Sequence, residues 1–150
     1  MKLKIPPVVI FFLAIGIIFG AHYLWPEYSY QFSYQTLVSR LFLAVGVLVA
    51  FSGIITFRMK GTTVDPLHPD KASALVTSGV YRYTRNPMYL GMALVVLGGI
   101  IRIGNPIGVL GVIFFIWYID RFQIRPEEES LTKLFGEEYL RFCGQVRRWI

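Results

Sequence analysis

Apolar residues in this chain gather in four long runs, and shorter polar segments separate them. The stretches without any Asp, Glu, Lys or Arg are 8–24, 41–57, 86–101 and 103–119. A helix needs about 20 mainly apolar residues, and at least about 17, to cross the hydrocarbon core of a bilayer. The pattern therefore predicts an all-α integral membrane protein with about four transmembrane helices. Their expected bounds are 8–24, 37–57, 87–101 and 103–120.

The third apolar run is the shortest, so we expect a short or tilted helix there. Lys2 and Lys4 precede the first run, as basic residues would in a secretory signal peptide. We expect a retained span instead, because the run is long and the bulky residues 22–26 offer no small-residue cleavage site. The 150 residues should then form a single membrane domain, and only 16% of them are charged, against about 25% in soluble domains.

The fifteen Lys and Arg residues are distributed unevenly among the polar segments. The segment 25–36 has none, whereas 58–86 has five and the tail from Asp120 onward has six. Because basic residues favour the cytoplasmic side of a membrane, this distribution predicts that both termini and the central loop are cytoplasmic. The net charge of +6 is then explained by a basic collar, that is, the Lys and Arg residues beside the spans that face anionic membrane lipids. No nucleic-acid partner is expected.

Two longer polar segments flank the third and fourth runs. The loop at about 60–86 contains several Gly and Pro residues, so we expect it to be irregular. The segment at about 126–146 is predicted to form a cytosolic amphipathic helix that begins at Pro126. Its apolar stripe should lie against the ends of the spans and consists of Leu131, Phe135, Tyr139, Phe142 and Val146.

Small residues recur along the apolar runs, and in lipid they let helix backbones approach closely. We expect one packing face at Gly16 and Gly20 in the first span. A second face should run along the second span, through Ala44, Gly46, Ala50 and Gly53. The short turn at 104–106 predicts a tight hairpin of the third and fourth spans. The residues expected to bring these two helices together are Gly98, Gly99, Gly108 and Gly111.

The polar residues just before the third span form a candidate anion site. Asn86 is a suitable N-cap, and Pro87 is a suitable first helical residue. A helix N-terminus attracts anions through its free N–H groups and its dipole, and Arg85 adds a full positive charge. We therefore expect an anionic group of a ligand at Arg85.

Three consecutive glutamates follow Pro126. Glu127 and Glu128 lie four and three residues before Leu131, so they border the apolar stripe, whereas Glu129 falls on the solvated face. Acidic groups beside a membrane usually have a function, which favours a carboxylate pair in a polar pocket. The alternative is that the glutamates only complement the dipole at the start of the helix.

The sequence predicts no metal site. Cys143 is the only cysteine, and His22 and His68 are far apart without metal-ligand spacing. There is no Ser/His/Asp combination for nucleophilic catalysis, and His68 is the single candidate for a general base.

Two strips of the chain resemble the signatures of the isoprenylcysteine carboxyl methyltransferase family and its phospholipid methyltransferase relatives. The first is LVTSGVYRYTRNPMYLG at 75–91, and the second is EEESLTKLFGEEY at 127–139. The resemblance covers roughly residues 60–150. The chain has Asn86 where eukaryotic members usually have His, and Val80 where they often have Pro. The first departure weakens a claim that the substrate is a prenylated protein, but Asn86 can still donate a hydrogen bond, so loss of cofactor binding is not expected.

The resemblance implies an integral membrane methyltransferase that uses S-adenosylmethionine at the cytosolic face. Carried over by position, the cofactor-binding residues are Val76, Gly79, Tyr81, Arg85, Asn86, Pro87, Tyr89, Gly91, Glu127 and Glu128. Arg85 and Glu128 are the candidate catalytic residues. Arg85 suits the carboxylate of the cofactor, and Glu127 or Glu128 suits its ammonium group. Tyr81 and Tyr89 offer ring faces for the sulfonium or the adenine, whereas Tyr83 is expected to be an interfacial anchor.

The expected methyl acceptor is a lipophilic molecule that enters from the bilayer. The favoured reaction is O-methylation of a carboxylate, such as that of an isoprenylcysteine-like group. One alternative is N-methylation of a phospholipid of the phosphatidylethanolamine type, and another is a non-catalytic membrane binding or assembly protein with the same fold. Arg121 and Arg125 are candidates for binding an acidic head group, unless they belong only to the basic collar.

Overall fold

The computed structural model describes residues 5–61 and 73–150, and every regular element in these two ranges is a helix. The longer helices are α1 (Pro7–Leu24), α2 (Gln35–Met59), α3 (Pro87–Ile103), α4 (Val109–Tyr118), α5 (Arg125–Phe135) and α6 (Glu137–Gln145). The 3-10 turns are η1 (Pro26–Tyr28), η3 (Gly79–Arg82) and η4 (Pro106–Gly108), and η5 (Ile119–Ile124) is a π-helical segment.

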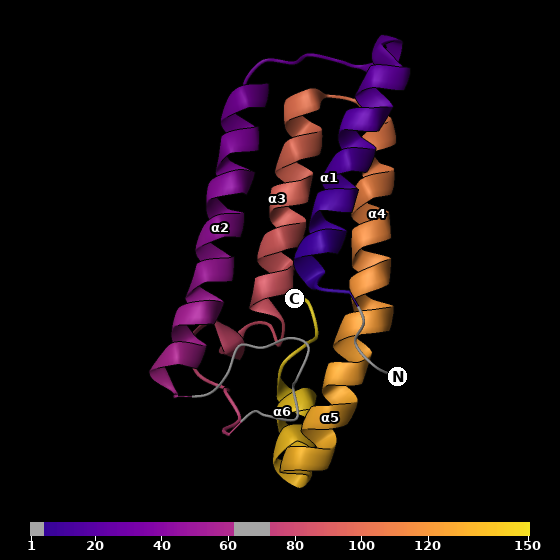
Figure 1. Ribbon diagram of the computed structural model, residues 1–150. Helices are drawn as coiled ribbons and strands as arrows, with labels where there is room; N and C mark the ends of the chain where they lie inside the picture. The colour runs from indigo at the N-terminus through magenta and orange to yellow at the C-terminus, as the bar shows by residue number, and fades with distance from the viewer. Residues whose placement is uncertain (1–4, 62–72) are drawn as a thin grey trace.

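Three helical runs are long and apolar enough to cross a membrane, namely α1, α2 and the run Pro106–Phe135. The fourth apolar helix, α3, has 17 residues and is shorter, as its sequence predicted. Figure 1 shows these four rods side by side, with α5 and α6 at the end of the bundle where α3 begins. The predicted all-α membrane fold is therefore confirmed.

Helices α2 and α3 pack closely because glycine faces glycine. A Cβ atom added at Gly46 would lie 2.7 Å from the carbonyl oxygen of Gly91, and one added at Gly91 would collide with Gly46 and Ala50. Gly53 similarly lies against Pro87 and Met88 at the start of α3. The small-residue face predicted for the second span is therefore confirmed at these positions, and it positions the first turn of α3.

The other predicted glycine contacts differ from the expectation. Gly98 faces Leu43 and Ser39 of α2, while Gly99, Gly108 and Gly111 all face α1. Gly108 also lies against Ile100 of α3, so it is the one of the four that contributes to the contact between α3 and α4. The other three pack against α1 or α2, and α1 supplies Ile10, Ala14 and Ile18 to the core that it shares with α3 and α4. An added Cβ at Gly16 or Gly20 would have no atom within 4 Å, so neither glycine makes a close helix contact with residues 5–61 or 73–150.

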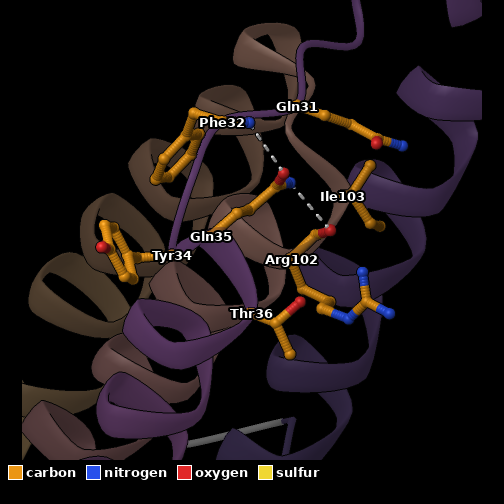
Figure 2. Close-up of a pocket in the computed structure, with 7 residues that line it drawn as sticks. All are labelled: Gln31, Phe32, Tyr34, Gln35, Thr36, Arg102 and Ile103. Atoms are coloured by element: carbon orange, nitrogen blue, oxygen red, sulfur yellow. Dashed lines mark hydrogen bonds between the residues drawn. The ribbon is translucent and has the colours of Figure 1, made fainter.

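The loop between α1 and α2 and the turn between α3 and α4 meet at the far end of the bundle. The amide of buried Asn105 donates to the carbonyl oxygen of Trp25 at 2.8 Å, and its own side-chain oxygen accepts from the Ile107 N–H. The Gln35 amide donates to the carbonyl oxygens of Ile101 and Arg102, as Figure 2 shows in part. These bonds satisfy backbone groups that the helix ends leave free.

A shallow hollow lies beside Gln35 at this end, away from the predicted cofactor residues. Figure 2 shows its lining: Gln31, Phe32, Tyr34, Gln35, Thr36, Arg102 and Ile103. The aromatic residues of the neighbouring loop are exposed, including Tyr30 and Tyr34, which agrees with a segment that lies along a membrane surface.

The helix predicted to begin at Pro126 begins at Arg125 as α5, but it is continuous with the fourth span and ends at Phe135 instead of running to about residue 146. The fourth span continues through η5 into α5, so that α4, η5 and α5 form one rod with Pro126 inside it (Figure 1). Proline cannot donate a helical hydrogen bond, and the π-helical segment just before it is where the bonding register changes. The actual break is at Gly136, whose φ of 53° separates α5 from α6.

The amphipathic stripe is nevertheless formed across this break. Tyr139 and Phe142 of α6 are buried together with Val76 and Tyr81 of the central loop. The remaining stripe residues, Leu131, Phe135 and Val146, pack against this cluster. The two helices therefore hold the described part of the central loop against the end of the bundle.

Candidate functional site

The strip before α3 is held by the segment that follows α6. The Arg85 N–H donates to the carbonyl oxygen of Arg147 at 3.0 Å. The carbonyl oxygen of Arg148 accepts from the Asn86 amide at 2.9 Å and from the Thr84 hydroxyl at 3.3 Å. Asn86 thus occupies the N-cap position of α3, but its side chain does not cap the helix, contrary to the prediction. The side chain is used for a tertiary contact instead.

A network of ion pairs surrounds Glu128. Arg85 Nη2 lies 3.1 Å from Glu128 Oε1, while Arg148 binds the same carboxylate through both Nε, at 3.1 Å, and Nη2, at 2.6 Å. Arg148 Nη1 also lies 2.8 Å from Asp120 Oδ1, and Arg125 Nε lies 3.1 Å from Asp120 Oδ2. Glu128 is thus bound by two guanidinium groups. These bonds raise the pKa of Arg148 above its usual range, chiefly through Glu128.

The neighbouring Glu127 has different partners. Its Oε1 accepts from the Tyr89 hydroxyl at 2.6 Å and from the Gln123 amide at 2.5 Å. Among the residues that the structure describes, no Lys, Arg or His forms an ion pair with it. Glu127 therefore presents a partly buried carboxylate held by neutral donors, and a charge removed from water in this way normally has a cationic partner.

Two buried polar atoms near these glutamates, the Tyr81 hydroxyl and Arg85 Nε, have no hydrogen-bond partner in the part of the chain that the structure describes. Burial, followed by the nearby Glu127 carboxylate, raises the pKa of Tyr81 far above its usual range, so the hydroxyl keeps its proton. The Tyr81 ring packs edge-on against Phe57 with its centroid 5.2 Å away. Buried polar groups are rarely left unsatisfied, so both atoms are candidates for contact with a ligand.

The π-helical segment η5 orients this arrangement. A π turn inserts one residue into a helix, which rotates all later side chains by roughly 100° relative to an uninterrupted helix. Asp120 and Gln123 belong to η5, and Glu127 and Glu128 follow it in the first turn of α5. The insertion thus sets which side chains of the rod face Tyr89 and Arg85.

The remaining predicted site residues are more dispersed. Val76 is buried in the apolar cluster beneath Tyr81, and Gly79, with a φ of 62°, faces Thr56. Pro87 is buried at the start of α3, and Gly91 packs against α2 rather than lying beside the glutamates. The outliers are Arg121, which is exposed, and Arg125, which is half exposed at the edge of the ion-pair network.

The predictions made for residues outside the proposed cofactor site can be compared with the structure one by one. Glu129 is exposed, as predicted, and Tyr83 is exposed, which agrees with the interfacial anchor expected there. His68 lies outside the described residues. Within the described ranges, no group of three His, Cys, Asp or Glu residues could hold a metal ion.

Sequence reasoning missed three participants: Arg148, Asp120 and Gln123. Arg148 had been counted only as one of the basic residues of the tail, where nothing distinguishes it from Arg147. Asp120 carried a usable signal, because it is the single acidic residue between Asp70 and Glu127 and directly follows an apolar run.

The arrangement provides two complementary ligand sites within one polar cluster. Glu127 suits a cationic group, whereas Arg85, with its free Nε and its position before the N-terminus of α3, suits an anionic group. A ligand that carries both charges next to each other would engage both sites.

The chain is similar in sequence to a family of membrane methyltransferases and to several of its members. Residues 34–138 match the family model described as phospholipid methyltransferase. Protein-S-isoprenylcysteine O-methyltransferase of Homo sapiens is 30% identical over 122 residues, which are 81% of this chain and 43% of that protein. The enzyme of the same name from Saccharomyces cerevisiae is 29% identical over 131 residues, covering 83% of this chain and 54% of that protein.

A protein of Haemophilus influenzae described as uncharacterized is 46% identical over 63 residues, which are 42% of this chain and all of that protein. The chain spans about half the length of the two O-methyltransferases. No solved structure matches. The family match covers well over half of the chain and includes the first strip and all but the last residue of the second, so the chain belongs to the phospholipid methyltransferase family.

Proposed function

We propose that this protein is an S-adenosylmethionine-dependent integral membrane methyltransferase that acts on a lipophilic acceptor. Family membership implies a methyl donor. The observation that carries the choice of donor is the partly buried Glu127 carboxylate, which has no cationic partner among the described residues. The adjacent Glu128 pairs with Arg85, whose buried Nε also has no partner among those residues. S-adenosylmethionine has an ammonium group and a carboxylate on the same carbon, and these groups match the two sites.

The residues present fit this cofactor. Glu127 would bind the ammonium group, and Arg85 would bind the carboxylate beside the first turn of α3. The Tyr81 hydroxyl is available as a further hydrogen-bond donor or acceptor, and the rings of Tyr81 and Tyr89 are buried nearby. Of the two predicted glutamates, Glu127 is the better ammonium ligand, because Glu128 is already bound by Arg85 and Arg148.

The chemistry places few demands on catalytic groups. Bound S-adenosylmethionine supplies a methyl group already activated by the sulfonium charge. The chain must hold donor and acceptor in line and exclude water, which are the usual contributions of positioning to a displacement reaction. A carboxylate acceptor needs no general base, and an amine needs only to arrive unprotonated. The ordered cluster of Arg85, Tyr89 and Glu127 fits such a positioning role.

The favoured acceptor is a lipophilic carboxylate of the isoprenylcysteine type, since the relatives from Homo sapiens and Saccharomyces cerevisiae are named isoprenylcysteine O-methyltransferases. The alternative is N-methylation of a phosphatidylethanolamine-type phospholipid, which the description of the family model favours. In either case the acceptor would approach from the bilayer. Arg125 and Arg121 are the proposed contacts for an acidic head group, Arg125 with the closer placement.

The polar cluster is proposed to face the cytoplasm. The clustered residues lie at the bundle end that also holds most of the basic residues, which the positive-inside tendency assigns to that side.

The first experiment measures binding of S-adenosylmethionine and S-adenosylhomocysteine to the detergent-purified protein by calorimetry. We expect Glu127→Gln to weaken both affinities by about tenfold or more, because it removes the charge opposite the ammonium group. Glu129→Gln is the matched control, since Glu129 is the exposed neighbour with the same side chain. Absence of binding to the unaltered protein would refute the methyltransferase proposal, and equal affinity in Glu127→Gln would refute the role of Glu127.

The second experiment identifies the acceptor. The protein, supplied with radiolabelled S-adenosylmethionine, is incubated with a farnesylcysteine analogue or with phosphatidylethanolamine. A labelled methyl ester on the first supports the isoprenylcysteine branch, and a labelled methylamine on the second supports the phospholipid branch. Cofactor binding without transfer to either acceptor would favour a non-catalytic binding protein.

A further inference from the structure

Arg148 makes the most extensive polar contacts of the cluster, although it lies outside both strips that resemble the family signatures. Its guanidinium contacts Glu128 through two nitrogen atoms and Asp120 through the third. Its carbonyl oxygen accepts hydrogen bonds from the Thr84 hydroxyl and the Asn86 amide. The residue therefore connects the segment after α6 to η5, to α5 and to the strip before α3.

The contact with Glu128 has a specific consequence for Arg85. Arg148 Nη2 holds Glu128 Oε2 at 2.6 Å, so that Glu128 presents only Oε1 to Arg85. Arg85 Nε, which would be the second donor of a bidentate pair, is left buried without a partner. Arg–carboxylate pairs are commonly bidentate. Without Arg148, Glu128 could turn its free oxygen to Arg85 Nε and close the pair.

The charge balance of the network points in the same direction. The guanidinium groups of Arg85, Arg125 and Arg148 face the carboxylates of Asp120 and Glu128, so these five ion-paired groups alone carry one surplus positive charge. The separate Glu127 carboxylate belongs to the cation-binding part of the site and is not counted in this network. Removal of the Arg148 side chain would leave this network neutral. A partly buried cluster without surplus charge attracts an anion much less strongly, because nearby opposite charges cancel at short range.

We propose that Arg148 is a positioning residue that keeps Arg85 available for an anionic ligand group by holding the Glu128 carboxylate away from it. The anion is the carboxylate of the cofactor or the acidic head of the methyl acceptor. The inference rests on the proposed function, in which Arg85 binds such a group. Arg148 itself touches neither reactant in this role.

The test compares two ligands of the purified protein in detergent. S-adenosylhomocysteine carries the amino-acid carboxylate, whereas 5′-methylthioadenosine has the same adenosine thioether without it. We expect Arg148→Ala to weaken binding of S-adenosylhomocysteine by about tenfold and to leave that of 5′-methylthioadenosine unchanged within about twofold. Arg147→Ala is the matched control, because Arg147 is the exposed neighbour and makes no side-chain ion pair among the described residues.

A double substitution provides the sharper readout. In Arg148→Ala/Glu128→Gln the side chain that would neutralise Arg85 is itself uncharged, so affinity for S-adenosylhomocysteine should return toward that of the unaltered protein. A merely structural role of Arg148 predicts no such recovery. If Arg148→Ala does not yield folded protein, Arg148→Lys serves in its place, since a single ammonium nitrogen cannot reproduce the bidentate contact with both oxygens of Glu128.

The outcomes separate the possible sources of the anion. A loss confined to S-adenosylhomocysteine, with recovery in the double variant, supports the proposal for the cofactor carboxylate. Unchanged nucleotide affinities together with a raised KM for an acidic acceptor, again recovered in the double variant, support it for the acceptor. Equal loss of both nucleotides, or no loss with an unchanged KM, overturns it. If the unaltered protein binds neither nucleotide, the proposed function itself fails, and this inference fails with it.

Discussion

Two adjacent glutamates with identical side chains have opposite electrostatic surroundings in this protein. Glu128 is neutralised by Arg85 and Arg148, whereas Glu127 accepts hydrogen bonds only from uncharged groups. Both residues were predicted to border the apolar stripe. The difference between them arises from which neighbour faces Tyr89 and which faces the ion-pair network, and it assigns the two carboxylates different tasks.

The two buried tyrosines of the site allow a paired test at the same scale. Tyr81→Phe removes a hydroxyl that has no partner, so the ligand-free protein should be unchanged or more stable by about 1 kcal/mol. Tyr89→Phe removes the donor to Glu127 and should destabilise the protein by about 1–3 kcal/mol. Thermal unfolding in detergent without ligand measures both. A larger loss for Tyr81→Phe than for Tyr89→Phe would show that the Tyr81 hydroxyl has a structural partner.

At the scale of the elements, the close approach of α2 and α3 determines where the strip before α3 lies. Gly91→Ala places a methyl group against the backbone of Gly46 and the side chain of Ala50, so the helices must separate. We expect a loss of about 1–3 kcal/mol of stability. The measurement is the unfolding temperature in detergent.

Gly16→Ala in α1 is the control for this substitution, because nothing lies within 4 Å of the added Cβ. It should be neutral or stabilising by up to about 1 kcal/mol, since alanine favours helix more than glycine does. If both variants lost stability equally, the glycines would matter for backbone conformation and not for the contact between α2 and α3.

The buried turn at the other end of the bundle can be tested in the same way. Asn105→Ala leaves the carbonyl oxygen of Trp25 and the N–H of Ile107 without their side-chain partner. Loss of these bonds should cost about 2–4 kcal/mol, again read as a lower unfolding temperature. Gln31→Ala, on the exposed loop beside the hollow of Figure 2, should change it little. A neutral Asn105→Ala would mean that water replaces the amide.

For the whole molecule, the proposed orientation can be read from chemical labelling in intact cells. Because Cys143 is the single cysteine, Cys143→Ser removes every thiol that could react with the label. A cysteine introduced at Glu27, in the loop between α1 and α2, should react with a membrane-impermeant maleimide, whereas one at the exposed Glu129 should react only after permeabilisation. The reverse pattern would place the polar cluster on the outer side and would contradict the proposed orientation.

Much of the architecture could be predicted from the sequence. The four apolar helices were expected from runs of contiguous residues, because the cost of placing a segment in lipid depends on that segment alone. The shortness of α3, the amphipathic stripe of the tail and the exposure of Glu129 followed from the same local patterns. The residues of both resembling strips were also identified, and the structure brings Arg85, Tyr89 and Glu127 to one end of the bundle.

Only the tertiary structure decided two things: which side chains far apart in the sequence contact each other, and which way the side chains of each helix face. Asn86 binds a carbonyl oxygen 62 residues away, and Arg148 rather than Arg147 reaches Glu128, which no local pattern distinguishes. The π-helical segment carries the rod through Pro126 and rotates the glutamates into place. The hydrophobicity of a span is a sum over contiguous residues, so it can be calculated from the sequence. A hydrogen bond or an ion pair forms only if the fold brings two side chains, which are distant in the sequence, to within about 3 Å of each other.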